Sequence, residues 1–258
     1  MDEAKSSSVP CIPGLSLHNG QCPSDNNEVK DMSTKPFREV VGSLMFAATV
    51  SRPDITFAMS QVSRFLYNPG LEHWNAAKTI LKYLQGTQNL TLLYKADAIL
   101  LEAYYDADFA GDYDTRRSTT GYVSLLASGP ITWSSHRQKC VTRSTTEAEY
   151  IAASDAASEI IWLQGFLQQL GINIRKPTIL YVDNQSTTRL IKNIDHHKRT
   201  KHIDIKYHYI REHVENGTIQ VNYICSEKQS ADIFTKALSR DKYIINRNAL
   251  SLDHRNVK

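Results

Sequence analysis

The chain has 258 residues, of which 41% are hydrophobic, which is enough for one large domain with a sizeable core and argues against disorder throughout. Its net charge of +3 at pH 7 permits a polyanionic partner without requiring one. The four cysteines lack the spacing of a zinc finger or a disulfide framework, which indicates a reducing compartment. Because the sequence has neither a signal peptide nor a run of roughly 18 apolar residues, we expect an intracellular protein, cytoplasmic or nuclear, that is neither secreted nor bound to a membrane.

The first third of the chain divides into two parts. Residues 1–35 are rich in Ser, Pro, Gly, Asn and Asp and have little apolar periodicity, so we expect a loose leader or connection there. In residues 36–96, apolar side chains recur at steps of three and four, with a break at Pro53 and a further helix predicted at 74–84, ending near Gly86. This pattern predicts a small helical subdomain without obvious chemistry.

The apolar period then changes to that of β-strands. Three consecutive strands joined by short turns, which indicate an antiparallel meander, are predicted at 100–109, 121–127 and 131–134. A helix is then predicted at 145–170, a strand at 178–182, two helices at 185–192 and 202–215, a strand at 219–224 and a last helix from about Ser230. A strand that follows a helix is typically added in parallel. The expected fold class is therefore α/β, with a mixed five-stranded sheet flanked by helices over residues 97–240 and a C-terminal tail at 241–258.

Glu149 is the acidic residue with the best local argument for a chemical role. It lies three residues before Ala152, on an apolar stripe that continues along the predicted helix through Ala156. Its neighbour Glu147 completes an S/T-x-x-E capping box with Ser144, which gives Glu147 a structural role that Glu149 lacks. A buried carboxylate is costly without a partner or a cation, which favours a metal ligand or general base over a satisfied buried acid at Glu149.

Two aspartates lie on the first predicted strand. Asp106 and Asp108 share one face of it, because side chains alternate along a strand, and aspartate is uncommon in strands. Asp108 is better explained as the start of the turn toward Gly111. Asp106 directly follows the apolar run, and for it a chemical role and a strand-end role are equal alternatives.

Two further aspartates stand at the ends of predicted elements. Asp183 follows a predicted strand, at the edge where open α/β sheets bind ligands, but it could also be the N-cap of the next helix, a role equally open to Asn184 or Ser186. Asp232 opens the last predicted helix, where a negative charge gains from the helix dipole without any chemistry. Taken alone, Asp232 is therefore better explained structurally.

Six motifs follow one another between residues 105 and 236. They are Tyr105-Asp106-Ala107-Asp108-Phe109-Ala110-Gly111, Arg116-Arg117-Ser118-Thr119-Thr120-Gly121-Tyr122, Ser144-Thr145-Thr146-Glu147-Ala148-Glu149-Tyr150, Val182-Asp183-Asn184, Lys201-His202-Ile203-Asp204-Ile205 and Ala231-Asp232-Ile233-Phe234-Thr235-Lys236. In this order they resemble the ribonuclease H domain of copia-type (Ty/copia) LTR retrotransposon Pol polyproteins. Residues 36–94, with Ser51-Arg52-Pro53-Asp54-Ile55, resemble the segment between polymerase palm and nuclease, a thumb- or connection-like remnant of the reverse transcriptase.

The resemblance implies a function and a site. The implied catalytic and metal-binding residues are Asp106, Glu149, Asp183 and Asp232. The implied reaction is endonucleolytic hydrolysis of the RNA strand of RNA–DNA hybrids by two Mg²⁺ (or Mn²⁺) ions about 3.5–4 Å apart, bridged by Asp106. Oxygen ligands suit these hard cations rather than zinc, and no small-molecule cofactor is expected. The implied fold is a ribonuclease H-like mixed sheet.

The sequence departs from the family pattern in two respects. Cellular ribonucleases H carry a histidine in the loop before the last carboxylate, whereas residues 225–229 contain none. No Asp-Asp dipeptide occurs in the chain, so the paired-aspartate turn of a polymerase palm is missing and we expect no DNA synthesis. Polymerase, protease and integrase portions are not recognisable. The alternative to an active nuclease is therefore a catalytically silent retrotransposon relic or a nucleic-acid-binding remnant.

Basic residues suggest where a hybrid could bind. The densest basic stretch runs from Lys192 to His213, and it indicates either a groove for the hybrid backbone or a solvated helix face. The candidate hybrid-binding residues are Arg116, Arg117, Asn184, Lys198, Arg199, Lys201 and His202. A zinc site from His196, His197, His202 and His208 is disfavoured, because no ligand pairs recur at finger spacing.

Overall fold

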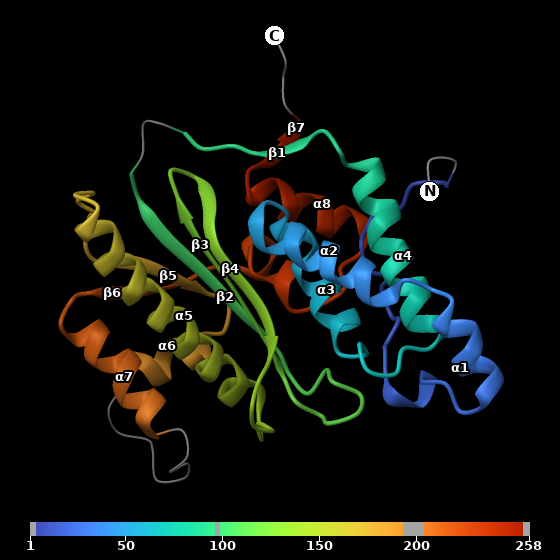
Figure 1. Ribbon diagram of the computed structural model, residues 1–258. Helices are drawn as coiled ribbons and strands as arrows, with labels where there is room; N and C mark the ends of the chain where they lie inside the picture. The colour runs from blue at the N-terminus through green and yellow to red at the C-terminus, as the bar shows by residue number, and fades with distance from the viewer. Residues whose placement is uncertain (1–3, 96–98, 193–203, 255–258) are drawn as a thin grey trace.

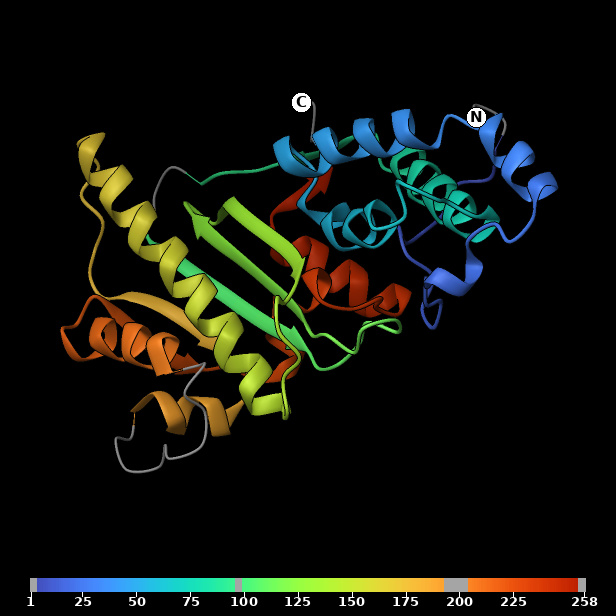
Figure 2. The ribbon, with the colours of Figure 1, turned by 60° about the horizontal axis from the view of Figure 1, so that its bottom comes forward.

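A five-stranded sheet separates two layers of helices (Figures 1 and 2). The computed structural model describes residues 4–95, 99–192 and 204–254. The strands lie in the order β4-β3-β2-β5-β6, with the bounds β2 (Leu101–Asp108), β3 (Thr119–Leu126), β4 (Gly129–Arg137), β5 (Thr178–Val182) and β6 (Ile219–Tyr223). Neighbours among β2, β3 and β4 are antiparallel, whereas β5 pairs in parallel with both β2 and β6. The predicted mixed five-stranded sheet flanked by helices is confirmed.

Three helices cover one face of the sheet: α5 (Thr145–Gln169), α6 (Gln185–Lys192) and α7 (Asp204–Glu215). The buried stripe of α5 carries small residues such as Ala152 and Ala156, which pack close to Ala103 and Tyr105 of β2. The helix ends before Gly171, whose φ of 75° suits a residue without a side chain. Although α5 is the longest helix, neither it nor any other described helix is long and apolar enough to cross a membrane.

A second group of helices packs on the opposite face. It comprises α2 (Phe37–Val50), the 3₁₀ turn η2 (Pro53–Ile55), α3 (Thr56–Ser63), α4 (Leu71–Gly86) and, from the end of the chain, α8 (Arg240–Ala249). These helices share one apolar core with Val123 and Leu125 of β3. The indole Nε1 of Trp133 on β4 donates to the carbonyl of Ala48 on α2 at 2.8 Å. The predicted helical subdomain is thus present, but its core is continuous with the sheet.

A buried ion pair fixes the turn between α2 and α3. Arg52 donates through Nε and Nη2 to the two carboxylate oxygens of Asp54, at 2.9 and 2.7 Å. Tyr83 Oη of α4 donates to the same carboxylate at 2.5 Å, and Tyr243 Oη of α8 donates to the carbonyl of Asp54 at 2.9 Å. The break predicted at Pro53 is therefore the point to which α4 and α8 are tied.

The N-terminal segment is more ordered than expected. Its described part contains a 3₁₀ turn η1 (Asn19–Gln21) and a helix α1 (Asn26–Ser33). The side chain of Asp25 caps α1 by accepting from the backbone N–H groups of Asn27 and Glu28. Leu17 and Met32 are buried. The composition of residues 1–35 hid this order, because a single good cap and two anchoring apolar side chains leave almost no periodic signal.

The C-terminal end also differs from expectation. Instead of one helix from about Ser230, a 3₁₀ turn η4 (Asp232–Phe234) is followed by an extended link and then by α8. The expected tail contributes α8 and strand β7 (Leu252–His254), which pairs antiparallel with β1 (Leu90–Leu92). The long helix fails because the Thr235 hydroxyl bonds to Asp106 and to the carbonyl of Asp232. Tertiary contacts therefore override the local helical pattern.

We expect Asp54→Ala to lower the stability of the group of helices that packs on the second face of the sheet. The substitution leaves the buried guanidinium of Arg52 without its carboxylate, which typically costs about 3–5 kcal/mol. Urea denaturation would measure the loss in the free energy of unfolding. Asp31→Ala is the matched control, because Asp31 pairs with Lys35 on the surface and its loss should cost less than about 1 kcal/mol. Equal losses in both variants would contradict the role given to Asp54.

Candidate metal centre

Three of the four predicted acids meet at one end of the sheet. Asp106 belongs to β2, Glu149 to the second turn of α5, and Asp183 directly follows β5. Each offers one carboxylate oxygen, and these three oxygens lie within 4.8 Å of one another. The meeting follows from the topology, because β2 and β5 are parallel neighbours whose carboxyl ends point the same way.

The start of α5 separates the roles of Glu147 and Glu149. Ser144 Oγ accepts from the backbone N–H of Glu147 at 3.2 Å, and Glu147 Oε2 accepts from the backbone N–H of Arg143 at 2.7 Å. Glu147 is thus a capping residue, as predicted, although it reaches one residue further back than a capping box requires. Glu149 is only 6% exposed, and its Oε2 has no hydrogen-bond partner in the described part of the chain.

Burial and mutual repulsion perturb these carboxyls. The pKa of Glu149 lies well above its usual range, mainly because the group is buried and also because Asp106 and Asp183 are near. Burial raises the pKa of Asp106 to about 6, against the opposing effect of Lys236. Three convergent carboxylates with one unpaired, buried oxygen fit a hard divalent cation such as Mg²⁺ or Mn²⁺, which would favour their charged forms.

Asp183 is free of the capping role that was its alternative. Asn184 Oδ1 accepts from the backbone N–H of Thr187 at 3.1 Å and so caps α6. Asp183 Oδ2 instead accepts from Ser226 Oγ at 2.9 Å. Ser226 lies in the loop that lacks the family histidine, and there it orients an acid of the group.

Asp232 lies outside the group of three. Its carboxylate is 1% exposed and binds two lysines: Lys236 Nζ lies 2.9 Å from Oδ1, and Lys242 Nζ lies 2.7 Å from Oδ2. Lys236 Nζ also lies 3.2 Å from Asp106 Oδ2. An ammonium group therefore links Asp232 to the three acids.

Two residues whose roles were not predicted from the sequence, Thr235 and Lys236, contact Asp106 and Asp232. Thr235 Oγ1 donates to Asp106 Oδ2, and Lys236 bridges the two aspartates. Burial would lower the pKa of Lys236, but both carboxylates raise it above its usual range. The available signal was the spacing of four residues between Asp232 and Lys236, which brings opposite charges together within one turn.

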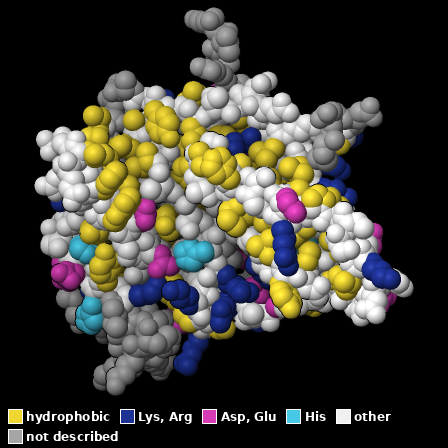
Figure 3. Space-filling view, viewed as in Figure 1, with side chains coloured by type: hydrophobic (Ala, Val, Ile, Leu, Met, Phe, Trp, Pro, Cys, Tyr) yellow, Lys and Arg dark blue, Asp and Glu magenta, His cyan; other side chains and the backbone are white. Residues whose placement is uncertain are grey.

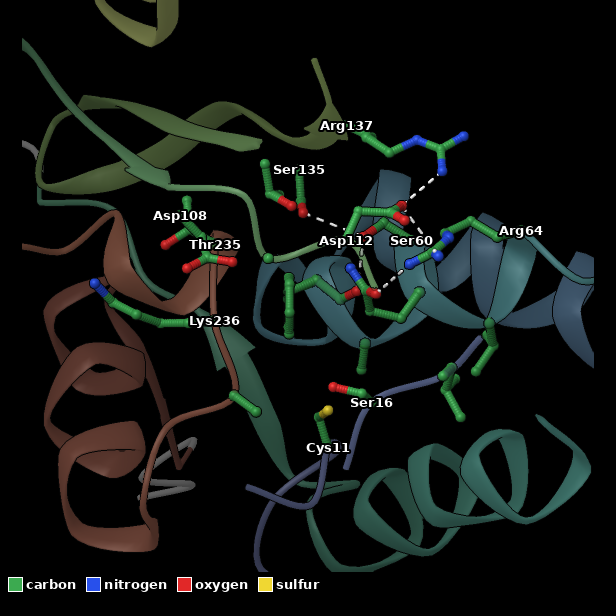
Figure 4. Close-up of a pocket in the computed structure, with 18 of the residues that line it drawn as sticks. Cys11, Ser16, Ser60, Arg64, Asp108, Asp112, Ser135, Arg137, Thr235 and Lys236 are labelled. Carbon is green, nitrogen blue, oxygen red and sulfur yellow. Dashed lines mark hydrogen bonds and ion pairs between the residues drawn. The ribbon is translucent and has the colours of Figure 1, made fainter. Parts of the chain in front are cut away.

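A cavity of about 530 Å³ opens between the sheet and the helical group (Figure 4). Asp108, the last residue of β2, lines it together with Lys236 and does not join the three acids. On another side of the cavity, Asp112 binds Arg137 Nη1 at 2.6 Å and Arg64 Nη2 at 3.1 Å. These two ion pairs attach the loop after β2 to β4 and α3.

The structure describes only some of the predicted hybrid-binding residues. Arg117 lines the cavity, while Arg116 is exposed with a φ of 55° and donates its backbone N–H to the carbonyl of Asp112. Lys198, Arg199, Lys201 and His202 lie outside the described residues, as do His196 and His197 of the disfavoured zinc set. His208 of that set is exposed on α7.

Known proteins resemble this chain over most of its length. The Pol polyprotein from transposon TNT 1-94 of Nicotiana tabacum is 46% identical over 243 residues, which are 94% of this chain and 18% of that polyprotein. The Pol polyprotein from transposon RE1 of Arabidopsis thaliana is 42% identical over 246 residues, 94% of this chain and 16% of that polyprotein. No protein-family model matches. The chain spans less than a fifth of these relatives.

The relatives at 42–46% identity over most of this chain are thus retrovirus-related Pol polyproteins from copia-type transposons. Among solved structures, LC11-RNase H1, which was isolated from compost by a metagenomic approach, is similar to it. The match covers 53% of this chain and 93% of that one, with 19% identity and a TM-score of 0.41.

We expect the metal-free protein to become less stable as pH rises, because of Glu149. A carboxyl whose pKa is raised by folding contributes to the stability of the folded state below its ordinary pKa of about 4.5. This contribution is lost as pH rises through the folded pKa. Glu149→Gln stays neutral, so its free energy of unfolding should exceed that of the wild type more at pH 8 than at pH 5. Urea denaturation with EDTA measures both differences.

Glu147→Gln is the control for this prediction, because Glu147 accepts a backbone hydrogen bond and lies outside the acid group. It should show no gain that grows with pH. If the free energies of unfolding of Glu149→Gln and the wild type differed by the same amount at both pH values, the raised pKa of Glu149 would be contradicted.

Proposed function

We propose that this chain contains a ribonuclease H that hydrolyses the RNA strand of RNA–DNA hybrids with Mg²⁺ or Mn²⁺. The observation that carries the proposal is the convergence of Asp106, Glu149 and Asp183 from three elements. One oxygen of this group, Glu149 Oε2, is buried and has no hydrogen-bond partner among the described residues. Similarity to the Pol polyproteins of copia-type transposons supports the substrate class, since the motifs that hold these acids resemble the nuclease of that family.

The chain's own residues would hold and orient the metal ligands. Asp106, Glu149 and Asp183 would hold the cofactor, which when bound supplies an activated water and positive charge at the departing 3′ oxygen. The hydroxyls of Ser226 and Thr235 each donate to one of the aspartates and restrict its rotation. The aspartates are thereby held in a geometry that needs little rearrangement, which favours catalysis.

The surface offers positive charge to a polyanionic substrate. Lys and Arg side chains gather in the lower middle of the face seen in Figure 3. Arg117 lies between β2 and β3 and lines the same cavity as Asp108 and Lys236, so we take it as the residue that contacts a phosphate of a bound hybrid. Contacts of this kind position the backbone without reading its sequence.

The competing proposal is a silent relic that keeps the fold and has lost the activity. Decay of the site would have replaced or displaced at least one of the three acids. All three still converge, and Ser226 orients Asp183. This geometry favours the enzyme.

A cleavage assay separates the two proposals. We expect the wild-type chain to cut a fluorescent RNA–DNA hybrid with Mg²⁺, and Asp183→Asn to lose at least about 100-fold in rate, equivalent to about 2.7 kcal/mol. Asp155→Asn is the matched control, because Asp155 lies on α5 and pairs with Lys206 and His136 outside the acid group. Double-stranded DNA of the same sequence should remain uncut.

Either of two results would overturn the enzyme proposal. One is the absence of hybrid cleavage by folded wild-type protein at every Mg²⁺ and Mn²⁺ concentration tried. The other is equal cleavage by the wild type and Asp183→Asn, which would indicate a contaminating nuclease.

We expect Arg117→Ala to weaken hybrid binding to the same extent for all sequences. Loss of one phosphate contact should reduce the slope of log affinity against log salt concentration by about 0.9 if the contact is made as in duplex DNA. Fluorescence anisotropy in Ca²⁺ would measure the slope. Arg175→Ala is the control, because Arg175 is exposed just before β5, at the opposite end of that strand from Asp183. An unchanged slope for Arg117→Ala would remove Arg117 from the binding surface.

A further inference from the structure

Lys236 occupies the space between two of the four predicted ligands. Its Nζ lies 3.2 Å from Asp106 Oδ2 and 2.9 Å from Asp232 Oδ1. The carboxylates of Asp106 and Asp232 are 3% and 1% exposed, whereas the Lys236 side chain is 39% exposed. The ammonium group thus enters a buried pair of acids from the solvent side, and Figure 4 shows it at the edge of the cavity near Asp108.

Positive charge is distributed unevenly over the four acids. Asp232 has two ammonium partners, Lys236 and Lys242, and Asp106 shares one of them. For Glu149 and Asp183, no ion pair with a Lys or Arg is found in the described part of the chain. The uncompensated negative charge therefore lies on the side of the group where Asp106, Glu149 and Asp183 converge.

Local structure holds Lys236 in this place. Gly121 lies opposite Asp106 in the pairing of β2 with β3, and a Cβ added to it would lie 2.6 Å from Phe234 Cβ and Thr235 Cγ2. The absence of a side chain at Gly121 lets η4 pack directly against β3. The backbone N–H of Lys236 then donates to the carbonyl of Asp232 at 3.3 Å, so the lysine leaves the turn beside both aspartates.

We propose that Lys236 is a built-in cation at the position between Asp106 and Asp232, so that the centre binds one divalent ion tightly and a second only when Lys236 withdraws. The first ion uses Asp106, Glu149 and Asp183. This inference rests on the proposed metal-dependent function and changes its stoichiometry. Two like charges a few ångströms apart repel strongly in a partly buried site, so an ammonium and a second metal ion exclude one another.

The cavity makes the exclusion reversible. Lys236 lines this space of about 530 Å³, and Asp108 on the same wall offers a carboxylate whose pKa is raised by burial and lowered by Lys236. A lysine that moves away from Asp232 can therefore remain close to a negative charge. Asp232 then acts as a positioning residue for Lys236 in the one-ion state.

Ion counting tests this inference without an activity assay. Mn²⁺ titrations of the folded full chain, followed by calorimetry and by the EPR signal of free Mn²⁺, should give one tight ion for the wild type and two for Lys236→Met. Lys206→Met is the matched control, because Lys206 forms a similarly exposed lysine–aspartate pair, 2.6 Å from Asp155. This control should bind one ion.

Asp232→Asn keeps the inference testable even if Lys236→Met fails to fold. Since Asp232 binds lysines and lies outside the group of three, this variant should still bind one ion, with an affinity within about threefold of the wild type. Loss of the ion in Asp232→Asn would overturn the inference, as would two equally tight ions in the wild type or one ion in folded Lys236→Met.

The outcomes also separate this inference from the proposed activity. A wild-type chain that binds one ion, and gains a second in Lys236→Met, supports the inference even if no hybrid is cut. A chain that cuts the hybrid yet binds two ions tightly as wild type refutes the inference and leaves the nuclease in place.

Discussion

The mutual repulsion of buried carboxylates is the constraint around which this structure is organised. Asp106 and Glu149 are almost fully buried, and Asp183 lies beside them, so the fold holds together groups that would separate if they were free. The strength to do so comes from the parallel pairing of β2 with β5 and from the close packing of the alanine stripe of α5. Rigid elements thus store an electrostatic strain that a cation can relieve.

The helical group on the other face of the sheet also helps to hold the acids in place. Its core runs without a break into β3 and includes Phe234 of η4, the turn that carries Asp232 and precedes Lys236. The ion pairs of Asp112 with Arg64 and Arg137 attach the loop after β2 to α3 and β4. Helices α3 and α4 therefore form one wall of the cavity that Lys236 also lines.

Much of this arrangement could be predicted from local patterns, and the remainder depends on long-range contacts. Periodicity and a capping neighbour singled out Glu149, and the limits of β5 and α6 follow directly from sequence signals. The predicted helix at Ser230 was wrong, because Thr235 bonds to a strand more than a hundred residues earlier. The ammonium between Asp106 and Asp232 was missed for the same reason, since a spacing of four residues indicates a pair but not its second partner.

The tie between α8 and the first helices has a consequence for how the chain folds during synthesis. Tyr243 is buried in the same core as Phe37 and donates to the carbonyl of Asp54. At roughly 5–20 residues per second, the ribosome adds Tyr243 some 10–40 s after Phe37. Throughout that interval the apolar faces of α2, α3 and α4 lack their last partner, so this half of the molecule completes its core only after all five strands of the sheet have been synthesised.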